Sequence, residues 1–234
     1  MGRWVVKRAN GMAHIPRESV GMRVLLVDHG CCDPPTTRAH RYRAQLAHQG
    51  IETLICGPAE ASPGLPAGGL HRINLQGMAA ASPLLLHLLR DGTAQAFLQA
   101  TGELPGHLLG LVRETARQTL AAAVDALEPD VIFVLHAGIL ADLAVETGAP
   151  VAVHVAHSDV ARYRHAPLTQ SRELVAAALA SAELVIAADA ATAEELQQHW
   201  LDATPPLPVW RLEDGAGEPI ATACRTALQR RHGR

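Results

Sequence analysis

The chain has few aromatic residues and no excess of basic charge. Phe, Trp and Tyr make up 3% of its 234 residues, so the core has to be built from the aliphatic side chains that dominate the 48% hydrophobic content. The formal net charge is -3 and Lys7 is the only lysine. The chain therefore lacks the electrostatic footprint of a nucleic-acid partner or of binding to an acidic membrane surface. The hydrophobic content with mixed charge predicts a globular chain.

Cysteine is scarce, and its spacing is not that of a metal site or a disulfide framework. Cys31, Cys32, Cys56 and Cys224 include no C-x-x-C pair. This pattern favours a reducing compartment, so we expect a cytoplasmic protein without a bound metal. No apolar run reaches the roughly 18 residues of a membrane helix, and no signal-peptide pattern is present. We therefore expect no integral membrane segment.

Three motifs of other enzyme classes are also missing. The first predicted strand is not followed by G-x-G-x-x-G, and the chain has neither a Walker loop nor a G-x-S-x-G turn. These absences count against a dinucleotide fold, P-loop chemistry and an α/β-hydrolase.

The clearest pattern lies in residues 129–159, PDVIFVLHAGILADLAVETGAPVAVHVAHSD. Val131–Leu135 is a short apolar run typical of a strand that is buried on both faces. Ile139–Thr147 has apolar residues at helical spacing, and Gly148 stands where a left-handed residue ends a helix. Val151–Val155 predicts a second strand. Together these segments predict a right-handed βαβ unit.

The same alternation of strands and helices continues on both sides of this unit. Further strands are predicted at Arg23–Asp28, Ile51–Cys56, His71–Leu75, Leu184–Ala187 and Pro208–Leu212. Further helices are predicted at Arg38–Gln49, Ala79–Ala100 with a break near Asp91-Gly92, Pro105–Leu127, Ser171–Ser181, Ala190–Leu201 and Glu218–Arg231. Thr36 or Thr37 can cap the first helix, and Thr192 and Glu195 have capping-box spacing. This rhythm predicts an α/β fold, a three-layer Rossmann-like domain with a mostly parallel sheet.

Several of these segments resemble the N-terminal domain of family-4-like glycosyltransferases of the GT-B fold. The likeness lies in the PD-apolar-H and H-x-(S/T)-D patterns of residues 129–159, in the RVLLV strand with the CCDPP loop, and in SAELVIAADAATAEEL. It covers about residues 22–215. Residues 1–21 show no apolar period and are interpreted as an N-terminal extension or as the result of a misplaced start codon. The resemblance implies that 22–215 form the acceptor-side domain, and we expect 216–234 to form a C-terminal helix and tail.

The resemblance also implies a function. Members of the family transfer a sugar from a nucleotide-sugar donor to a hydroxyl of an acceptor glycan or small molecule, commonly with retention and without an obligatory metal or other cofactor. Because the family's donor-binding domain has no counterpart here, we expect an acceptor-side half that works with a separate donor-binding subunit. The alternatives are a non-catalytic, degenerate binding module of the same fold and a gene fragment without a function of its own.

Histidine follows both strands of the βαβ unit, at the edge where open parallel sheets bind ligands. The resemblance implies that His157 is the catalytic residue beside the donor sugar and phosphate, where an imidazole can donate a hydrogen bond. His157 comes seven residues after Pro150, one more than is usual in the family. Either a bulge brings His157 into the usual position or Ala156 occupies it. An ordinary loop histidine, with Asp159 capping the next segment, is the other interpretation.

The remaining candidates are residues that could bind the donor or the acceptor. The loop after the first strand has one glycine where many family members have two. The first helix carries Arg38, Arg41 and Arg43, which either bind an acceptor phosphate or carboxylate or form a solvated face. The turn after Val131–Leu135 precedes a helix N-terminus, which favours anions. These candidates are Gly30, Arg41, His136, Gly138, Ser158 and Asp159.

Overall fold

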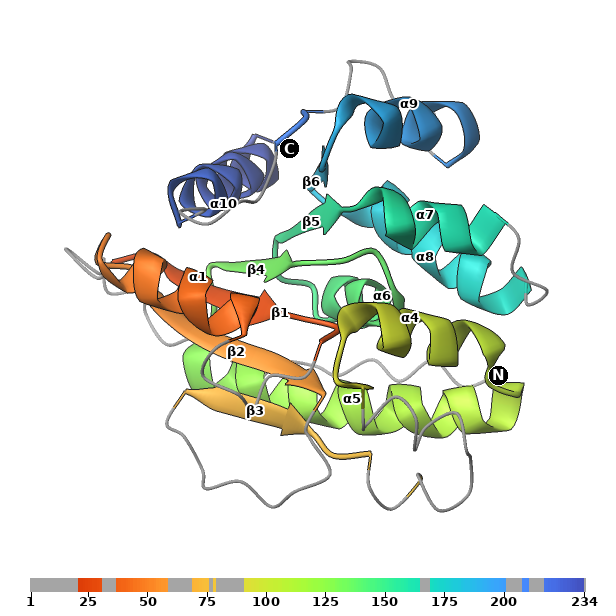
Figure 1. The fold of residues 1–234 in the computed structure, drawn as a ribbon. Coiled ribbons are helices and arrows are strands. Elements are labelled where there is room, and N and C mark those ends of the chain that lie inside the picture. The colour runs from red at the N-terminus through yellow and green to blue at the C-terminus, as the bar shows by residue number, and fades with distance from the viewer. Residues whose placement is uncertain are drawn as a thin grey trace.

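The computed structural model describes residues 21–30, 37–58, 69–75, 78, 91–164, 169–200, 208–210 and 217–233. Six strands form one sheet in the order β3-β2-β1-β4-β5-β6, and every neighbouring pair is parallel (Figure 1). The strands are β1 (Arg23–Val27), β2 (Glu52–Pro58), β3 (Leu70–Ile73), β4 (Val131–Val134), β5 (Val151–Val155) and β6 (Leu184–Ala187). The helices are α1 (Arg38–Ala47), α4 (Ala94–Glu103), α5 (Gly106–Leu127), α6 (Ile139–Glu146), α7 (His157–Arg164), α8 (Thr169–Ser181), α9 (Ala190–His199) and α10 (Gly217–His232).

The strands bury both of their faces, because their side chains alternate between two hydrophobic cores. In β4, Ile132 and Val134 pack into the core that α4 to α9 cover, whereas Val131 and Phe133 pack toward α1 and α10. Figure 1 shows α1 and α10 on one side of the sheet, and α5 and α6 lie against its other face. The predicted fold class, a three-layer Rossmann-like domain, is confirmed, and the described sheet is entirely parallel.

The predicted βαβ unit and most of the other predicted elements are confirmed to within a few residues. Gly148 follows α6 with a φ of 77°, the left-handed conformation that was expected at the helix end. Gly92 has a φ of 67° and α4 begins just after it, in agreement with the predicted break. The predicted helical residues 79–90 lie outside the described residues. No described helix is both long and apolar enough to span a membrane.

Two details of the prediction were wrong. The N-cap of α9 is Asp189, whose Oδ1 accepts the Thr192 backbone N–H at 2.7 Å, so Thr192 and Glu195 do not form the predicted capping box. An aspartate at this position satisfies the first free N–H groups of a helix as well as a serine or threonine does. Pro208–Leu212 was predicted as a strand. Its described part, residues 208–210, makes a single bridge from Val209 to Ala187, and residues 211–212 lie outside the described ranges.

The C-terminal helix α10 is an integral part of the second covering layer. Its inward-facing residues are almost fully buried against the sheet and α1: Ile220, Ala221, Ala223, Cys224 and Ala227. Near its end, Arg230 Nη1 donates to the Glu183 carbonyl at 3.1 Å, and Arg231 Nη1 lies 3.3 Å from the Glu183 carboxylate. The same carboxylate accepts the Val151 N–H at 2.8 Å, so Glu183 ties α10 to the start of β5.

This packing predicts that truncating Ile220, which is 0% exposed, destabilises the whole domain. We expect Ile220→Ala to lower the free energy of unfolding in urea by about 2–5 kcal/mol, because it leaves a cavity between α10 and the sheet. The exposed Thr222 on the same helix is the matched control, and Thr222→Ala should change the value by less than about 0.5 kcal/mol. Equal effects of the two substitutions would mean that α10 does not pack as described.

Candidate functional site

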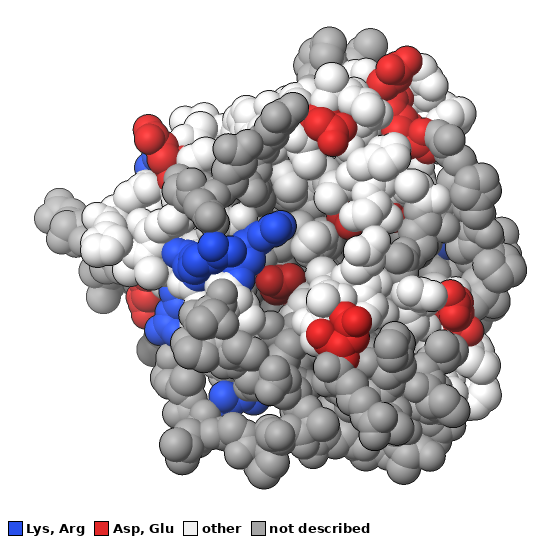
Figure 2. All heavy atoms as spheres, in the orientation of Figure 1, with Lys and Arg blue, Asp and Glu red and all other residues white. Residues whose placement is uncertain are grey.

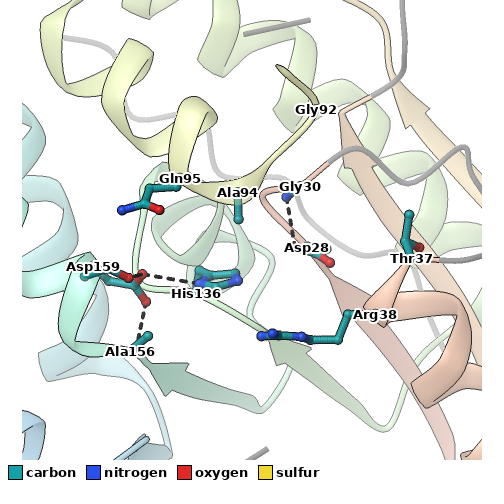
Figure 3. Close-up of a pocket in the computed structure, with 11 residues that line it drawn as sticks. Asp28, Gly30, Thr37, Arg38, Gly92, Ala94, Gln95, His136, Ala156 and Asp159 are labelled. Carbon is teal, nitrogen blue, oxygen red and sulfur yellow. Dashed lines mark hydrogen bonds and ion pairs between the residues drawn. The ribbon is translucent and has the colours of Figure 1, made fainter. Parts of the chain in front are cut away.

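A pocket opens at the carboxyl ends of β1, β4 and β5. In the strand order 3-2-1-4-5-6 the chain reverses its direction of winding between β1 and β4, and such switch points are where open α/β sheets bind ligands. The pocket has a volume of about 390 Å³. Its walls are formed by Asp28, Gly30, Thr37, Arg38, Gly92, Ala94, Gln95, His136, Ala156, Ser158 and Asp159 (Figure 3).

The carboxylate of Asp159 joins the loops that follow β4 and β5. Its Oδ2 accepts the backbone N–H groups of Ala137 at 3.1 Å and of Ala156 at 3.0 Å. Its Oδ1 lies 3.2 Å from Nδ1 of His136. The Asp159 side chain is 1% exposed, so these hydrogen bonds offset the cost of removing its carboxylate from water. The bond to Ala156 also closes the first turn of α7, as the acidic residue of a capping box does.

His136 is oriented by this contact. Because a carboxylate only accepts hydrogen bonds, Nδ1 of His136 carries the proton that faces Asp159, and Nε2 is left to meet a ligand. Burial lowers the pKa of His136, but the hydrogen bond and charge of Asp159, together with the charge of Asp28, outweigh burial and the opposing effect of Arg38. The pKa of His136 is therefore raised, and the imidazolium form persists to higher pH than in a free histidine.

Asp28 lies across the pocket from Asp159, directly after β1. It is 6% exposed, and its Oδ1 accepts the Gly30 backbone N–H at 2.9 Å. Burial raises the pKa of the Asp28 carboxyl, and this effect exceeds the opposing ones of His136, the Gly30 N–H and Arg38. A buried carboxyl with a raised pKa in a pocket suits proton transfer. The sequence contained a signal for it, an acid immediately after an apolar strand, which was overlooked.

The third side of the pocket is the start of α1. Arg38 is exposed, and its guanidinium extends across the pocket toward His136 (Figure 3). Thr37 occupies the N-cap position, but its hydroxyl does not cap the helix, and its buried Oγ1 has no hydrogen-bond partner among the described residues. Figure 2 shows basic side chains gathered on this face over α1, which gives the mouth of the pocket a positive side.

Beneath the pocket, His29 joins the end of β1 to the start of α6. It is 0% exposed, and its Nε2 accepts the Leu140 backbone N–H at 3.2 Å. Burial, and then the charge of His136, hold the pKa of His29 well below its usual range. The ring packs edge-on against Phe97 at a centroid distance of 5.6 Å. His29 is therefore a neutral structural residue that supports the loop carrying His136.

The structure brings only part of the predicted site together. The predicted residues that line the pocket are Gly30, His136, Ser158 and Asp159. Arg41 and His157 are exposed and do not line it, and Gly138 packs against His29 instead. At the end of β5, Ala156 lies in the pocket wall and His157 does not. The pocket is also lined by Ala94 and Gln95 at the start of α4 and by Gly92 just before it. The sequence did not indicate these residues, because only the folded chain brings α4 to this edge of the sheet.

A metal site does not form among the described residues, where no three His, Cys, Asp or Glu side chains are placed to bind an ion. The two histidines of β5 and α7 are separated. His154 is 5% exposed, and its Nε2 lies 3.2 Å from the Trp210 carbonyl on the α10 side of the sheet. His157 is exposed at the first position of α7.

No protein-family model matches the chain, and a search of curated proteins found no relative. Among solved structures, a piece of sucrose-phosphate synthase from Thermosynechococcus elongatus is similar at 12% identity and a TM-score of 0.51. The match covers 87% of this chain and 98% of that piece. UDP-GlcNAc 2-epimerase from Neisseria meningitidis, bound to UDP-GlcNAc, matches 80% of the chain at 14% identity and a TM-score of 0.42. Spinosyn rhamnosyltransferase SpnG, complexed with thymidine diphosphate, matches 82% at 19% identity and a TM-score of 0.38.

The match to sucrose-phosphate synthase supports the fold. The match to the sucrose-phosphate synthase piece extends over nearly all of both chains, so this chain has a glycosyltransferase-like α/β fold. The chain spans 45% of the epimerase and 50% of the rhamnosyltransferase, about half the length of each.

The close packing beneath the pocket predicts the effect of a methyl group at Gly138. A Cβ there would lie 2.5 Å from Nε2 of His29 and would overlap the Leu98 side chain, so we expect Gly138→Ala to destabilise the protein by about 1–3 kcal/mol. Gly110, in α5, is the control, because a Cβ there meets nothing within 4 Å. Gly110→Ala should stabilise the helix by up to about 1 kcal/mol in the same urea titration. If Gly138→Ala were neutral, His29 would not occupy this position.

The raised pKa of Asp28 predicts that this residue costs stability. The folded state binds its proton more tightly than the unfolded chain, so folding becomes less favourable as the pH rises above about 4 through the folded-state pKa. Asp28→Asn keeps an oxygen for the Gly30 N–H and removes the buried charge. We expect a higher Tm than the parent protein at pH 7–8, and a difference that shrinks as the pH falls to about 4. A lower Tm of Asp28→Asn at neutral pH would contradict this account.

Proposed function

We propose that this chain is the acceptor-side part of a glycosyltransferase that moves a sugar from a nucleotide-sugar donor to an acceptor hydroxyl. The observation that carries the proposal is the pocket at the strand ends, where the His136–Asp159 pair faces the buried carboxyl of Asp28. The glycosyltransferase-like fold supports the same reading. The family-4-like identity of the chain is part of the proposal.

Each side of the pocket has its own role in the proposed reaction. Asp28, ionised and with a raised pKa, accepts the proton of the acceptor hydroxyl as its oxygen bonds to the anomeric carbon of the donor. The bond from that carbon to the donor phosphate breaks at the same time. The His136 imidazolium, held by Asp159, donates a hydrogen bond from Nε2 to the negative charge that develops on the departing oxygen. His136 thus takes the role that the sequence assigned to His157.

The nucleotide of the donor is bound mainly elsewhere. Among the described residues, no Phe, Tyr or Trp lines the pocket, so these residues offer no aromatic surface on which a nucleobase could stack. We therefore place the nucleotide on a second unit, a further domain or a separate subunit, that closes over the strand ends. No cofactor beyond the nucleotide-sugar substrate enters this proposal.

A non-catalytic sugar-binding module is the second candidate. The observation that favours it is Ala156, which stands in the pocket wall where the resembled family has a histidine. This module would use the same pocket to bind a sugar, without the proton transfer to Asp28. The two candidates differ in what Asp28 does, because only the transferase needs a proton acceptor at that position.

Ligand binding measured by thermal shift tests the proposal. The panel contains free sugars, sugar phosphates, nucleotides and nucleotide sugars, and the variants are His136→Gln and His157→Ala. We expect sugar-containing ligands to raise the Tm of the parent protein and of His157→Ala, but not of His136→Gln, because only His136 lines the pocket. Substitution of His107, exposed on α5, by Gln is the control for removing a histidine without touching the pocket.

The outcomes separate the candidates. If no sugar-containing ligand shifts the Tm of the folded protein, both sugar-binding functions are ruled out. If the ligand binds, sugar transfer from a labelled nucleotide sugar is then assayed with the donor-binding unit present. Loss of transfer by at least about tenfold in Asp28→Asn, with sugar binding retained, supports the transferase. Unchanged transfer in Asp28→Asn would contradict the role of Asp28, and absence of transfer in the parent protein would favour the binding module.

A further inference from the structure

We propose that the acceptor bound in this pocket is an anionic sugar, whose phosphate or carboxylate lies against Arg38 at the start of α1. The inference rests on the proposed function, because it names the acceptor class of the same site. It also commits to where the two ends of the acceptor lie: the anionic group at the start of α1, and the reacting hydroxyl at Asp28.

The first observation is a pair of cationic groups, Arg38 and His136, that line the same pocket as the buried carboxyl of Asp28. The guanidinium of Arg38 extends toward His136 in Figure 3, and it makes no hydrogen bond or ion pair with another described residue. An oxyanion beside Arg38 would receive charge-assisted hydrogen bonds from its guanidinium, and the positive charge of His136 in the same pocket would add to the attraction while its Nε2 stays with the departing oxygen.

The second observation is that no side chain caps the N-terminus of α1. The first N–H groups of a helix have no partners within the helix and favour negative charge. A threonine at the N-cap position commonly satisfies one of them, but the Thr37 hydroxyl makes no such bond and its Oγ1 is without a partner among the described residues. The first backbone N–H groups of α1 are thus hydrogen-bond donors that lie next to Arg38.

Asp28 decides which end of the acceptor is anionic. Its carboxyl is 6% exposed and lies next to Gly30, near enough to His136 and Arg38 for their charges to act on its pKa. When ionised it would repel a phosphate, but it accepts hydrogen bonds from hydroxyl groups. A ligand that satisfies both sides carries hydroxyls toward Asp28 and a negative group toward Arg38, which is the chemistry of a sugar phosphate or a sugar acid.

The size and lining of the pocket favour an acceptor over the donor as the source of this anion. The volume of about 390 Å³ lies near the lower end of the roughly 300–1,000 Å³ of small-molecule sites. It suits one sugar with its substituent better than a whole nucleotide sugar. Because the described lining residues include no Phe, Tyr or Trp, a nucleoside diphosphate would contact them mainly by its phosphates.

Isothermal titration calorimetry with the whole chain tests the inference. The ligands are hexoses, the corresponding hexose phosphates and hexuronates, inorganic phosphate, and uridine diphosphate. The variants are Arg38→Gln, Arg38→Lys and, as a control that removes the same charge outside the pocket, Arg225→Gln on α10. We expect at least one hexose phosphate or hexuronate to bind about tenfold or more tightly than its neutral parent. Arg38→Gln should abolish that preference, Arg38→Lys should retain part of it, and Arg225→Gln should leave it unchanged.

Each contrary result has a separate meaning. Neutral and anionic sugars that bind equally, or a preference that survives in Arg38→Gln, would overturn the anionic acceptor and leave a neutral sugar as the substrate. Uridine diphosphate that binds most tightly through Arg38 would assign the anion to the donor and overturn the inference. Inorganic phosphate that binds as tightly as every sugar phosphate, with no sugar contribution, would keep the anion site but remove the glycosyltransferase proposal.

Discussion

The buried carboxylate of Asp159 fixes the geometry on which the candidate site depends. It receives hydrogen bonds from the backbone after β4 and from the backbone after β5, and it orients His136. Removing it would leave two backbone N–H groups and an imidazole without their acceptor, and the loss for a buried group such as the Ala137 N–H costs about 1–3 kcal/mol. In a parallel sheet the strand ends meet at one edge, so a single side chain placed there can join the loops that follow two strands.

The architecture was largely predictable from the sequence, because both faces of the sheet are buried. A strand such as Val131–Val134 must then be continuously apolar, and a helix such as Ile139–Glu146 must carry one apolar stripe. Strands and helices can therefore be told apart by their patterns of apolar residues. The predictions that differ from the structure concern a helix cap and the length of a strand, which depend on contacts formed in the folded chain. Asp189 capped α9 in place of Thr192, and only Val209 of the last predicted strand pairs with β6 among its described residues.

The site was less predictable because its residues meet only in the folded chain. His136 and Asp159 were both candidates, but their hydrogen bond joins residues 23 positions apart. The pattern of neighbouring residues in the sequence therefore could not indicate it. His157 was favoured through a resemblance in which it stands one position later than usual, and in the structure Ala156, not His157, lines the pocket. Arg38 could not be told from Arg41 until the direction of α1 was known. The start of α4 could not be predicted to line the pocket, because only the folded chain places it there.

The central claim is that ligands bind at the switch point between β1 and β4. An NMR titration of the isotopically labelled chain with a hexose phosphate tests this claim most directly, because backbone amides report binding one residue at a time. The account predicts that the amide signals of Gly30, Ala137 and Ala156 shift together and saturate with one affinity, since these amides hydrogen-bond to Asp28 and Asp159. Shifts confined to the separate hollow at Val209, Trp210 and Thr222, or no saturable shifts at all, would contradict it.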